Sequence, residues 1–138
     1  MEYIKEYTVK DEHIDMQNIM DGLYYPFYME ECRHEFVKDV LGIDIKKEAA
    51  KGNNLVLSQY TIKFLRSLKK GDVFTVNCSI YSDKDGGPRF YFKQSIFLNG
   101  KVMTQAVFTA TCVSSKGGRP FIPENLRQKL QSEPFLEE

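Results

Sequence analysis

Apolar and polar positions follow two different periods along this chain, and each period predicts one kind of element. Between Leu23 and Leu41 the apolar positions recur at intervals of three and four residues, the spacing of one helix face. Pro26 falls in the first turn of this segment, where its missing N–H does no harm. Gly42 follows the segment, as a glycine often does at a helix end. We therefore predict one long helix from Leu23 to Leu41.

Most of the remaining chain alternates between apolar and polar residues, which is the period of a β-strand. The expected strands, in chain order, are Tyr3–Val9, Leu55–Leu68, Val73–Tyr81, Arg89–Leu98 and Val102–Val113. Asn99-Gly100 is a hairpin signature between the last two strands. Short helices are expected at Lys46–Lys51 and Phe121–Leu130.

The order of these elements predicts an α+β fold: one strand, one long helix, then four strands that form a five-stranded antiparallel sheet. A single helix cannot cover both faces of such a sheet. The uncovered face or an edge strand then needs a partner, so we expect a homodimer or homotetramer. With 138 residues, the chain fits a single domain spanning residues 1–138.

Composition and charge exclude several classes of function. Nineteen basic residues balance nineteen acidic ones, so no overall field attracts nucleic acid, and no apolar run is long enough for a membrane span. The start of the chain is charged and does not read as a signal peptide, which indicates a cytoplasmic protein. No cofactor is implied. The three cysteines are far apart and predict buried, reduced thiols without a metal site: Cys32, Cys78 and Cys112.

The candidate chemistry lies just before the long helix. Asp15 stands in a polar turn ahead of the helix start, where backbone N–H groups are unpaired and the helix dipole is positive. A carboxylate beside such donors can attack a carbonyl that they polarise, or can activate water toward it. This pattern suggests acyl chemistry without a serine, cysteine or metal nucleophile.

The side chains around Asp15 have ordinary structural interpretations. Asp21 is expected to cap the helix, and His13 to be a solvent-exposed loop histidine, although it could also tune Asp15. Glu30 and Arg33 lie three residues apart on the helix, so they can pair at the surface or form a buried pair at a dimer seam. The tyrosines of the first turns are expected mainly in the core.

The residues described above resemble the pattern of one known family. Over nearly its whole length, the chain resembles the hotdog-fold thioesterases of the 4-hydroxybenzoyl-CoA thioesterase family. In that family an acid in a short loop is followed ten residues later by an aromatic residue, in a Y-x-x-Y-x-E-x-x-R helix opening. The matching residues are Asp15, Tyr25, Tyr28, Glu30 and Arg33. A Gly-Asp turn, the Asn-Gly hairpin and a tail motif follow in the family's order, at Gly71-Asp72, Asn99-Gly100 and Gly118–Glu124.

The resemblance implies a hotdog fold, in which a five-stranded antiparallel sheet wraps around one long helix. It implies hydrolysis of an acyl-CoA or acyl-carrier-protein thioester, with Asp15 as general base or nucleophile. The backbone N–H of Gly22 would hydrogen-bond the thioester carbonyl. The expected substrate contacts are Asn18, Tyr25, Arg66 and Arg89, the two arginines toward the phosphates of coenzyme A.

Some residues depart from the family pattern and keep alternatives open. Asn18 stands where many members have glycine, and Asp21-Gly22 replaces an aromatic-His pair, which motivates a non-catalytic module that binds acyl chains or a protein. Cys32-Arg33 is similar to a pair in polyketide-associated hotdog thioesterases that lack the acid, so carrier-protein substrates stay open. A hydratase would require a catalytic histidine on the helix, and His34 lacks the usual preceding pattern.

Overall fold

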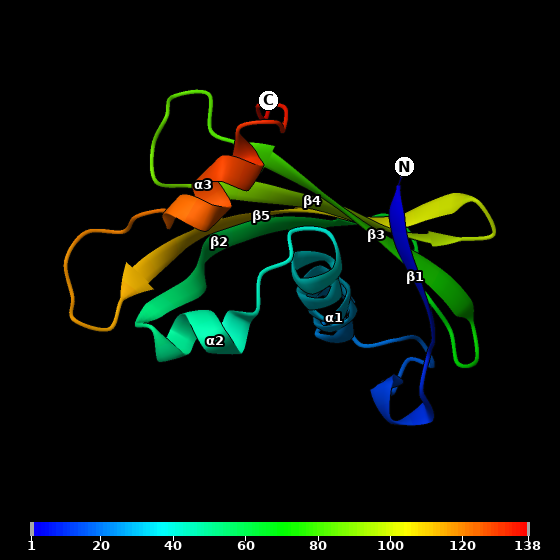
Figure 1. The fold of residues 1–138 in the computed structure, drawn as a ribbon. Coiled ribbons are helices and arrows are strands. Elements are labelled where there is room, and N and C mark those ends of the chain that lie inside the picture. Colours follow the sequence, from blue (N-terminus) through cyan, green and yellow to red (C-terminus); the bar gives the residue numbers. More distant parts are fainter. Residues whose placement is uncertain (1, 138) are drawn as a thin grey trace. The chain divides into compact units, whose positions relative to one another are not determined.

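The computed structural model describes residues 2–137, and it confirms the predicted α+β fold with a five-stranded antiparallel sheet (Figure 1). The strands are ordered β1-β3-β4-β5-β2, and β1 pairs with β3 so that Tyr3 lies opposite Cys78. The elements, in chain order, are β1 (Tyr3–Thr8), the 3-10 helix η1 (Asp11–His13), α1 (Tyr24–Asp39), α2 (Ile45–Ala50), β2 (Asn53–Phe64), β3 (Val73–Ser82), β4 (Phe90–Leu98), β5 (Lys101–Ser114) and α3 (Glu124–Leu130).

The predicted ends of several elements are confirmed by backbone conformation. Gly42 follows α1 with a φ of +67°, a left-handed conformation that glycine adopts without strain. Asn99 and Gly100 both have positive φ values, 51° and 79°, as a tight two-residue hairpin turn requires. Of the helices formed within residues 2–137, none is both long enough and apolar enough to cross a membrane.

The predicted strand from Leu55 to Leu68 was wrong at its end, because β2 stops at Phe64. The N–H groups of Leu65 and Arg66 both donate to the carbonyl oxygen of Met103, at 2.9 and 3.1 Å. Two successive amides on one acceptor break the regular pairing of a strand ladder. The chain therefore leaves the sheet here, and residues 65–72 form a loop that becomes important for the candidate site.

The chain divides into two compact units, which are described separately. The first unit comprises the N-terminal segment through His34 together with Ile62–Ser79 and Lys93–Ala106. The second comprises Glu35–Thr61, Ile80–Phe92 and the chain from Val107 onward. Each unit takes part of α1 and parts of β2, β3, β4 and β5, and the first unit also holds β1, so each has its own layer of helix against sheet.

In the first unit, α1 packs on the inward face of β3. The ring of Tyr28 lies 5.3 Å from that of Tyr7 and 5.0 Å from that of Phe74, measured between centroids. The Cys32 thiol donates a 3.5 Å hydrogen bond to the Val76 carbonyl. Alternate residues of β3 are buried, as the apolar–polar alternation predicts, so burial of this apolar face stabilises the contact between helix and sheet.

In the second unit, the rings of Phe36 on α1 and Phe92 on β4 meet edge to face, 6.2 Å apart. The short helices α2 and α3 lie on opposite sides of the strands (Figure 1). Glu48 of α2 is buried and accepts hydrogen bonds from Asn53 and Asn125 and also from Lys51. The hydrogen bond from Asn53 is the largest cause of a lowered Glu48 pKa, so the carboxylate stays ionised and ties the start of β2 to both short helices.

A buried polar network lies between α1 and β4 in the first unit. Arg33 is buried, whereas Glu30 is exposed and its carboxylate lies 3.6 Å from the His34 Nε2. The negative charge of Glu30 also acts on Arg33, and the predicted pairing of these two residues stays a prediction. The Arg33 Nη1 donates to Gln94 Oε1 at 3.0 Å, and Gln94 Nε2 donates to the Met29 carbonyl at 2.9 Å. Burial lowers the pKa of Arg33, but arginine stays protonated at neutral pH. Gln94 therefore orients a cation that the core would otherwise exclude.

Replacing Gln94 by leucine puts an apolar side chain of comparable size at this position of β4. The substitution removes the hydrogen bonds of Gln94 to Arg33 and to the helix backbone. We expect the free energy of unfolding, measured by urea denaturation, to fall by about 3 kcal/mol, because a buried charge loses a partner. Gln105→Leu makes the same change at an exposed position of β5 in the same unit. This control should stay within about 0.5 kcal/mol of the wild type. Equal stability of the two variants would contradict the role given to Gln94.

Candidate functional site

The loop before α1 is a tight hairpin that presents Asp15. Ile14 and Met20 form an antiparallel bridge, and the Asp15 N–H donates to the Ile19 carbonyl at 2.9 Å. Asn18 closes the turn with a φ of +66° and donates its N–H to the Asp15 carbonyl at 3.1 Å. Asparagine adopts this left-handed conformation more readily than most residues. Asn18 can therefore supply the positive φ that a glycine would also supply at this position.

The Asp15 carboxylate is held by its own loop. Its Oδ1 accepts a 2.8 Å hydrogen bond from the Gln17 N–H, which fixes the side-chain orientation. Its Oδ2 has no hydrogen-bond partner among residues 2–137, and the residue is half-buried. One oxygen is thus oriented by the backbone while the other remains available to a ligand.

The start of α1 offers an unpaired N–H group. Asp21 accepts the Leu23 N–H on its carboxylate at 2.9 Å and the Tyr24 N–H on its carbonyl at 3.0 Å, which confirms its predicted capping role. Gly22 is exposed, and its N–H has no acceptor within the described part of the chain. A Cβ at this position would lie an ordinary 3.8 Å from the Phe64 ring, so the fold itself does not demand glycine here.

A backbone segment after β2 fastens the hairpin to the helix. The carbonyl of Leu68 accepts the Met20 N–H at 2.8 Å, and its N–H donates to the Tyr25 hydroxyl oxygen at 2.9 Å. Tyr25 is buried, and burial is the main cause of its raised pKa; the negative charges of Asp15 and Asp72 raise it further. The hydroxyl therefore keeps its proton, and Tyr25 acts in this structure as an anchor. Its predicted contact with substrate stays a prediction.

His13 is buried beside the Asp15 hairpin, so the expectation of a solvent-exposed loop histidine was wrong, and its alternative role in tuning Asp15 stays a prediction. Its side chain is only 7% exposed, and its Nδ1 lies 2.8 Å from the Tyr28 hydroxyl oxygen. Its ring stacks on Tyr24 with centroids 3.8 Å apart. Its carbonyl accepts the Asp21 N–H at 2.9 Å, so His13 fixes both arms of the hairpin. The hydroxyl partner lies fifteen residues away, and no local pattern identifies it.

The two predicted arginine contacts lie in different units. Arg66 is exposed in the first unit, together with Asp15, Asn18, Gly22 and Tyr25, and its Nη1 donates to the Val102 carbonyl at 3.1 Å. Arg89 belongs to the second unit, where its Nη2 lies 3.5 Å from the carboxylate of the buried Asp83. Arg89 also lines a polar cavity of about 350 Å³ between residues of β2, β4 and β5 and the C-terminal segment.

The three cysteines are buried as predicted, and burial argues against a thiol nucleophile. It raises the pKa of Cys32 and of Cys112 to about 11, and it raises that of Cys78 as well. Very little thiolate, the reactive form, is therefore present at neutral pH. Residues 2–137 also contain no group of three or more metal-ligating side chains. The catalytic role expected for Asp15 stays a prediction.

Comparison with known proteins agrees with this architecture. Residues 9–130 match the thioesterase-like superfamily. A chloroplastic acyl-acyl carrier protein thioesterase of Arabidopsis thaliana is 31% identical over 127 residues, which cover 91% of this chain. The same match covers 65% of that relative, so the chain spans slightly less than two thirds of its length.

Solved structures share the fold at low sequence identity. A 1,4-dihydroxy-2-naphthoyl-CoA thioesterase from Synechocystis superposes with a TM-score of 0.83 at 15% identity, covering 96% of this chain and 97% of that one. A Staphylococcus aureus protein in complex with CoA superposes with a TM-score of 0.82 at 19% identity, covering 100% of this chain and 89% of that one. From the family match and this shared architecture we conclude that the chain is a member of the thioesterase-like superfamily with the hotdog fold.

Proposed function

We propose that this protein hydrolyses an acyl thioester, carried by coenzyme A or by an acyl carrier protein, to the free acid and the thiol. One observation carries the proposal: just before α1, a carboxylate oxygen of Asp15 and the N–H of Gly22 both lack a hydrogen-bond partner among residues 2–137. The names of the similar proteins support the substrate class, since they include thioesterases that act on both kinds of carrier.

The chemistry follows from these two groups. The Gly22 N–H, at the positive end of the helix dipole, would stabilise the negative charge that develops on the thioester oxygen. Asp15 would act in one of two ways. As a general base it takes a proton from water, whose oxygen attacks the carbonyl carbon; as a nucleophile it forms a mixed anhydride that water then hydrolyses. In both cases the carbon–sulfur bond breaks, and the thiolate leaves and is protonated.

The departures from the family pattern no longer favour a non-catalytic binding module. Asn18 adopts the left-handed conformation that explains a glycine at this position, and the Asp21 carboxylate is engaged with a helix N–H. Neither residue removes the free oxygen of Asp15. A hydratase is not supported either, because His34 is exposed and lies beside Glu30 rather than beside Asp15.

The exposed edge of the sheet supports the expected homodimer or homotetramer. β2 is an edge strand of twelve residues, and long edge strands with apolar side chains commonly pair with another chain. Its exposed apolar side chains in the second unit are Val56, Leu57 and Tyr60. We therefore include in the proposal self-association through the part of β2 that lies in the second unit, residues 53–61.

Asp15→Asn should abolish most of the activity while keeping the loop intact, because the amide oxygen can still accept the Gln17 N–H. We expect kcat to fall about a hundredfold or more in a thiol-release assay across a panel of acyl-CoA and acyl-carrier-protein substrates. Asp21→Asn is the matched control in the same loop. Asparagine is also a good helix cap, so this variant should keep nearly full activity. Full turnover by Asp15→Asn, or loss only in Asp21→Asn, would reject the assignment.

His13→Phe preserves the stacked ring but removes the hydrogen bond to Tyr28. We expect a folded protein whose kcat/KM falls roughly tenfold, because the Asp15 hairpin loses one of its fixed points. Tyr28→Phe should have a similar effect, and the double variant should be no worse than either single variant. His34→Phe makes the same substitution at an exposed position and should be neutral. Additive losses in the double variant would show that the hydrogen bond is not what matters.

A further inference from the structure

The last two residues of the edge strand β2 and the loop after it carry a concentration of positive charge on a neutral protein. From residue 63 to residue 72 there are four basic side chains and one acidic side chain, whereas the whole chain has nineteen of each. All four basic residues are exposed. We call them the basic loop: Lys63, Arg66, Lys69 and Lys70.

Three of these four cations have no carboxylate partner in the described part of the chain. Lys70 lies 3.5 Å from the Asp11 carboxylate, so its charge is partly compensated. Arg66 gives one donor to a backbone carbonyl and keeps its remaining N–H groups. No carboxylate of residues 2–137 pairs with Lys63, Arg66 or Lys69. The Asp72 carboxylate accepts the Lys69 backbone N–H at 2.8 Å, so the segment presents a net positive charge to the solvent rather than positive charge alone.

The basic loop is fixed directly to the candidate active site. Leu68, which lies between Arg66 and Lys69, bonds to Met20 of the Asp15 hairpin and to Tyr25 of α1. It is completely buried, so the backbone on both sides of it is held in place. A molecule that contacts Arg66 and Lys69 therefore lies beside Leu68, the residue whose backbone positions the Asp15 hairpin.

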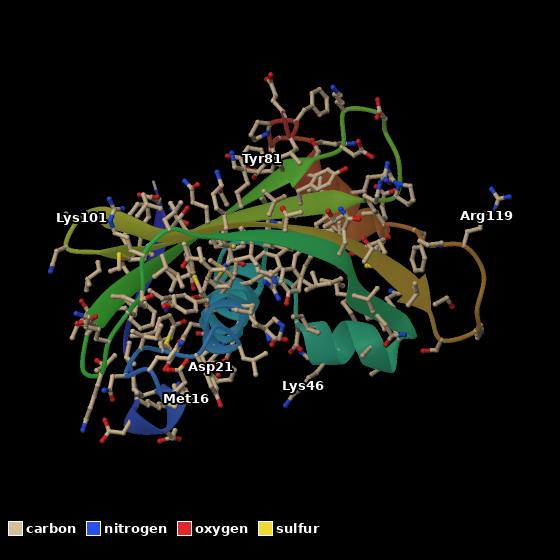
Figure 2. All side chains as sticks on the ribbon, turned by 180° about the vertical axis from the view of Figure 1, so that it is seen from behind. Met16, Asp21, Lys46, Tyr81, Lys101 and Arg119 are labelled. Carbon is tan, nitrogen blue, oxygen red and sulfur yellow. The ribbon has the colours of Figure 1, made fainter. Side chains whose placement is uncertain are left out.

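Exposed apolar side chains lie among these cations, and they favour a protein partner over a free nucleotide. Phe64 is 52% exposed and Leu65 46% exposed, between Lys63 and Arg66. Phe64 also lies against Gly22 and packs edge to face on Tyr25, with centroids 5.3 Å apart. Figure 2 shows another cation of this unit, Lys101, at the tip of the β4–β5 hairpin. The next residue in the chain, Val102, has the carbonyl that accepts the Arg66 hydrogen bond. Interleaved cations and apolar side chains suit an acidic protein surface that also has apolar residues.

We propose that the basic loop is the docking surface for an acidic acyl carrier protein, whose phosphopantetheine arm delivers the thioester to Asp15. This inference rests on the proposed thioesterase function and names the partner of that same site. Positive charge at the entrance raises the association rate with a negatively charged carrier and orients it, while the chemistry stays with Asp15 and Gly22.

The test compares three thioesters of one acyl group, on the carrier protein, on coenzyme A and on pantetheine, which has neither phosphate nor protein. In Lys63→Glu/Lys69→Glu, we expect kcat/KM for the acyl-carrier protein to fall about thirtyfold or more at low salt, mainly through KM. Hydrolysis of acyl-pantetheine should fall less than about twofold, since it needs no docking surface. Lys46→Glu/Lys116→Glu applies the same charge change to exposed lysines of the second unit and should leave all three rates near wild type.

Several outcomes would overturn the inference. An equal loss with acyl-CoA and with the carrier protein would mean that the loop binds phosphate alone. An equal loss with all three substrates, or a change in sedimentation, would mean that the surface supports the fold or a second copy of this chain. No loss with the carrier protein would reject the surface outright.

The proposed function can fail separately. If the wild type hydrolyses none of the three thioesters, binding of fluorescently labelled holo-acyl carrier protein still tests the docking surface. Anisotropy should then show binding to the wild type and to the control variant, and weaker binding to Lys63→Glu/Lys69→Glu. Equal binding by all three proteins, or no binding by the wild type, would reject it.

Discussion

The candidate site depends on the two hydrogen bonds made by the backbone of Leu68. Its carbonyl holds the hairpin that presents Asp15, and its N–H holds the tyrosine in the first turn of α1. Because Leu68 is fully buried, both bonds are protected from competition with water. The carboxylate, the helix start and the basic loop therefore share one fixed point, although they come from segments far apart in sequence.

The local geometry around this point orients both groups of the proposed mechanism through short-range hydrogen bonds. Gln17 orients the Asp15 carboxylate through a backbone N–H, and Asp21 caps the helix so that the Gly22 N–H is left over. His13 and Tyr28 secure the hairpin from the side of the core. A preorganised pair of this kind can stabilise charge in the transition state without rearranging during the reaction.

Local sequence patterns predicted the elements well, because periodicity, capping and turn residues act over a few residues. The helix that ends before Gly42, the Asn99-Gly100 hairpin and the buried face of β3 are examples. The patterns failed where a distant partner decides the outcome. β2 ends early because the Met103 carbonyl accepts two successive backbone N–H groups. His13 is buried because its Nδ1 has a hydrogen-bond partner in the Tyr28 hydroxyl. Arg33 of α1 is buried for the same reason, because it donates a hydrogen bond to Gln94 on β4. The resemblance predicted Asp15 and Gly22 as site residues, which stays a prediction, and the structure shows which residues position them.

The most direct test of the account is a crystal structure of the wild-type protein with a ketone analogue of an acyl-CoA, in which a methylene group replaces the sulfur and blocks hydrolysis. The measured quantities are the distances from the ketone oxygen to the Gly22 nitrogen and from the carbonyl carbon to Asp15 Oδ2. We predict about 3 Å for the first and about 3.5 Å or less for the second. A well-ordered analogue whose carbonyl lies away from both groups would contradict the proposed site.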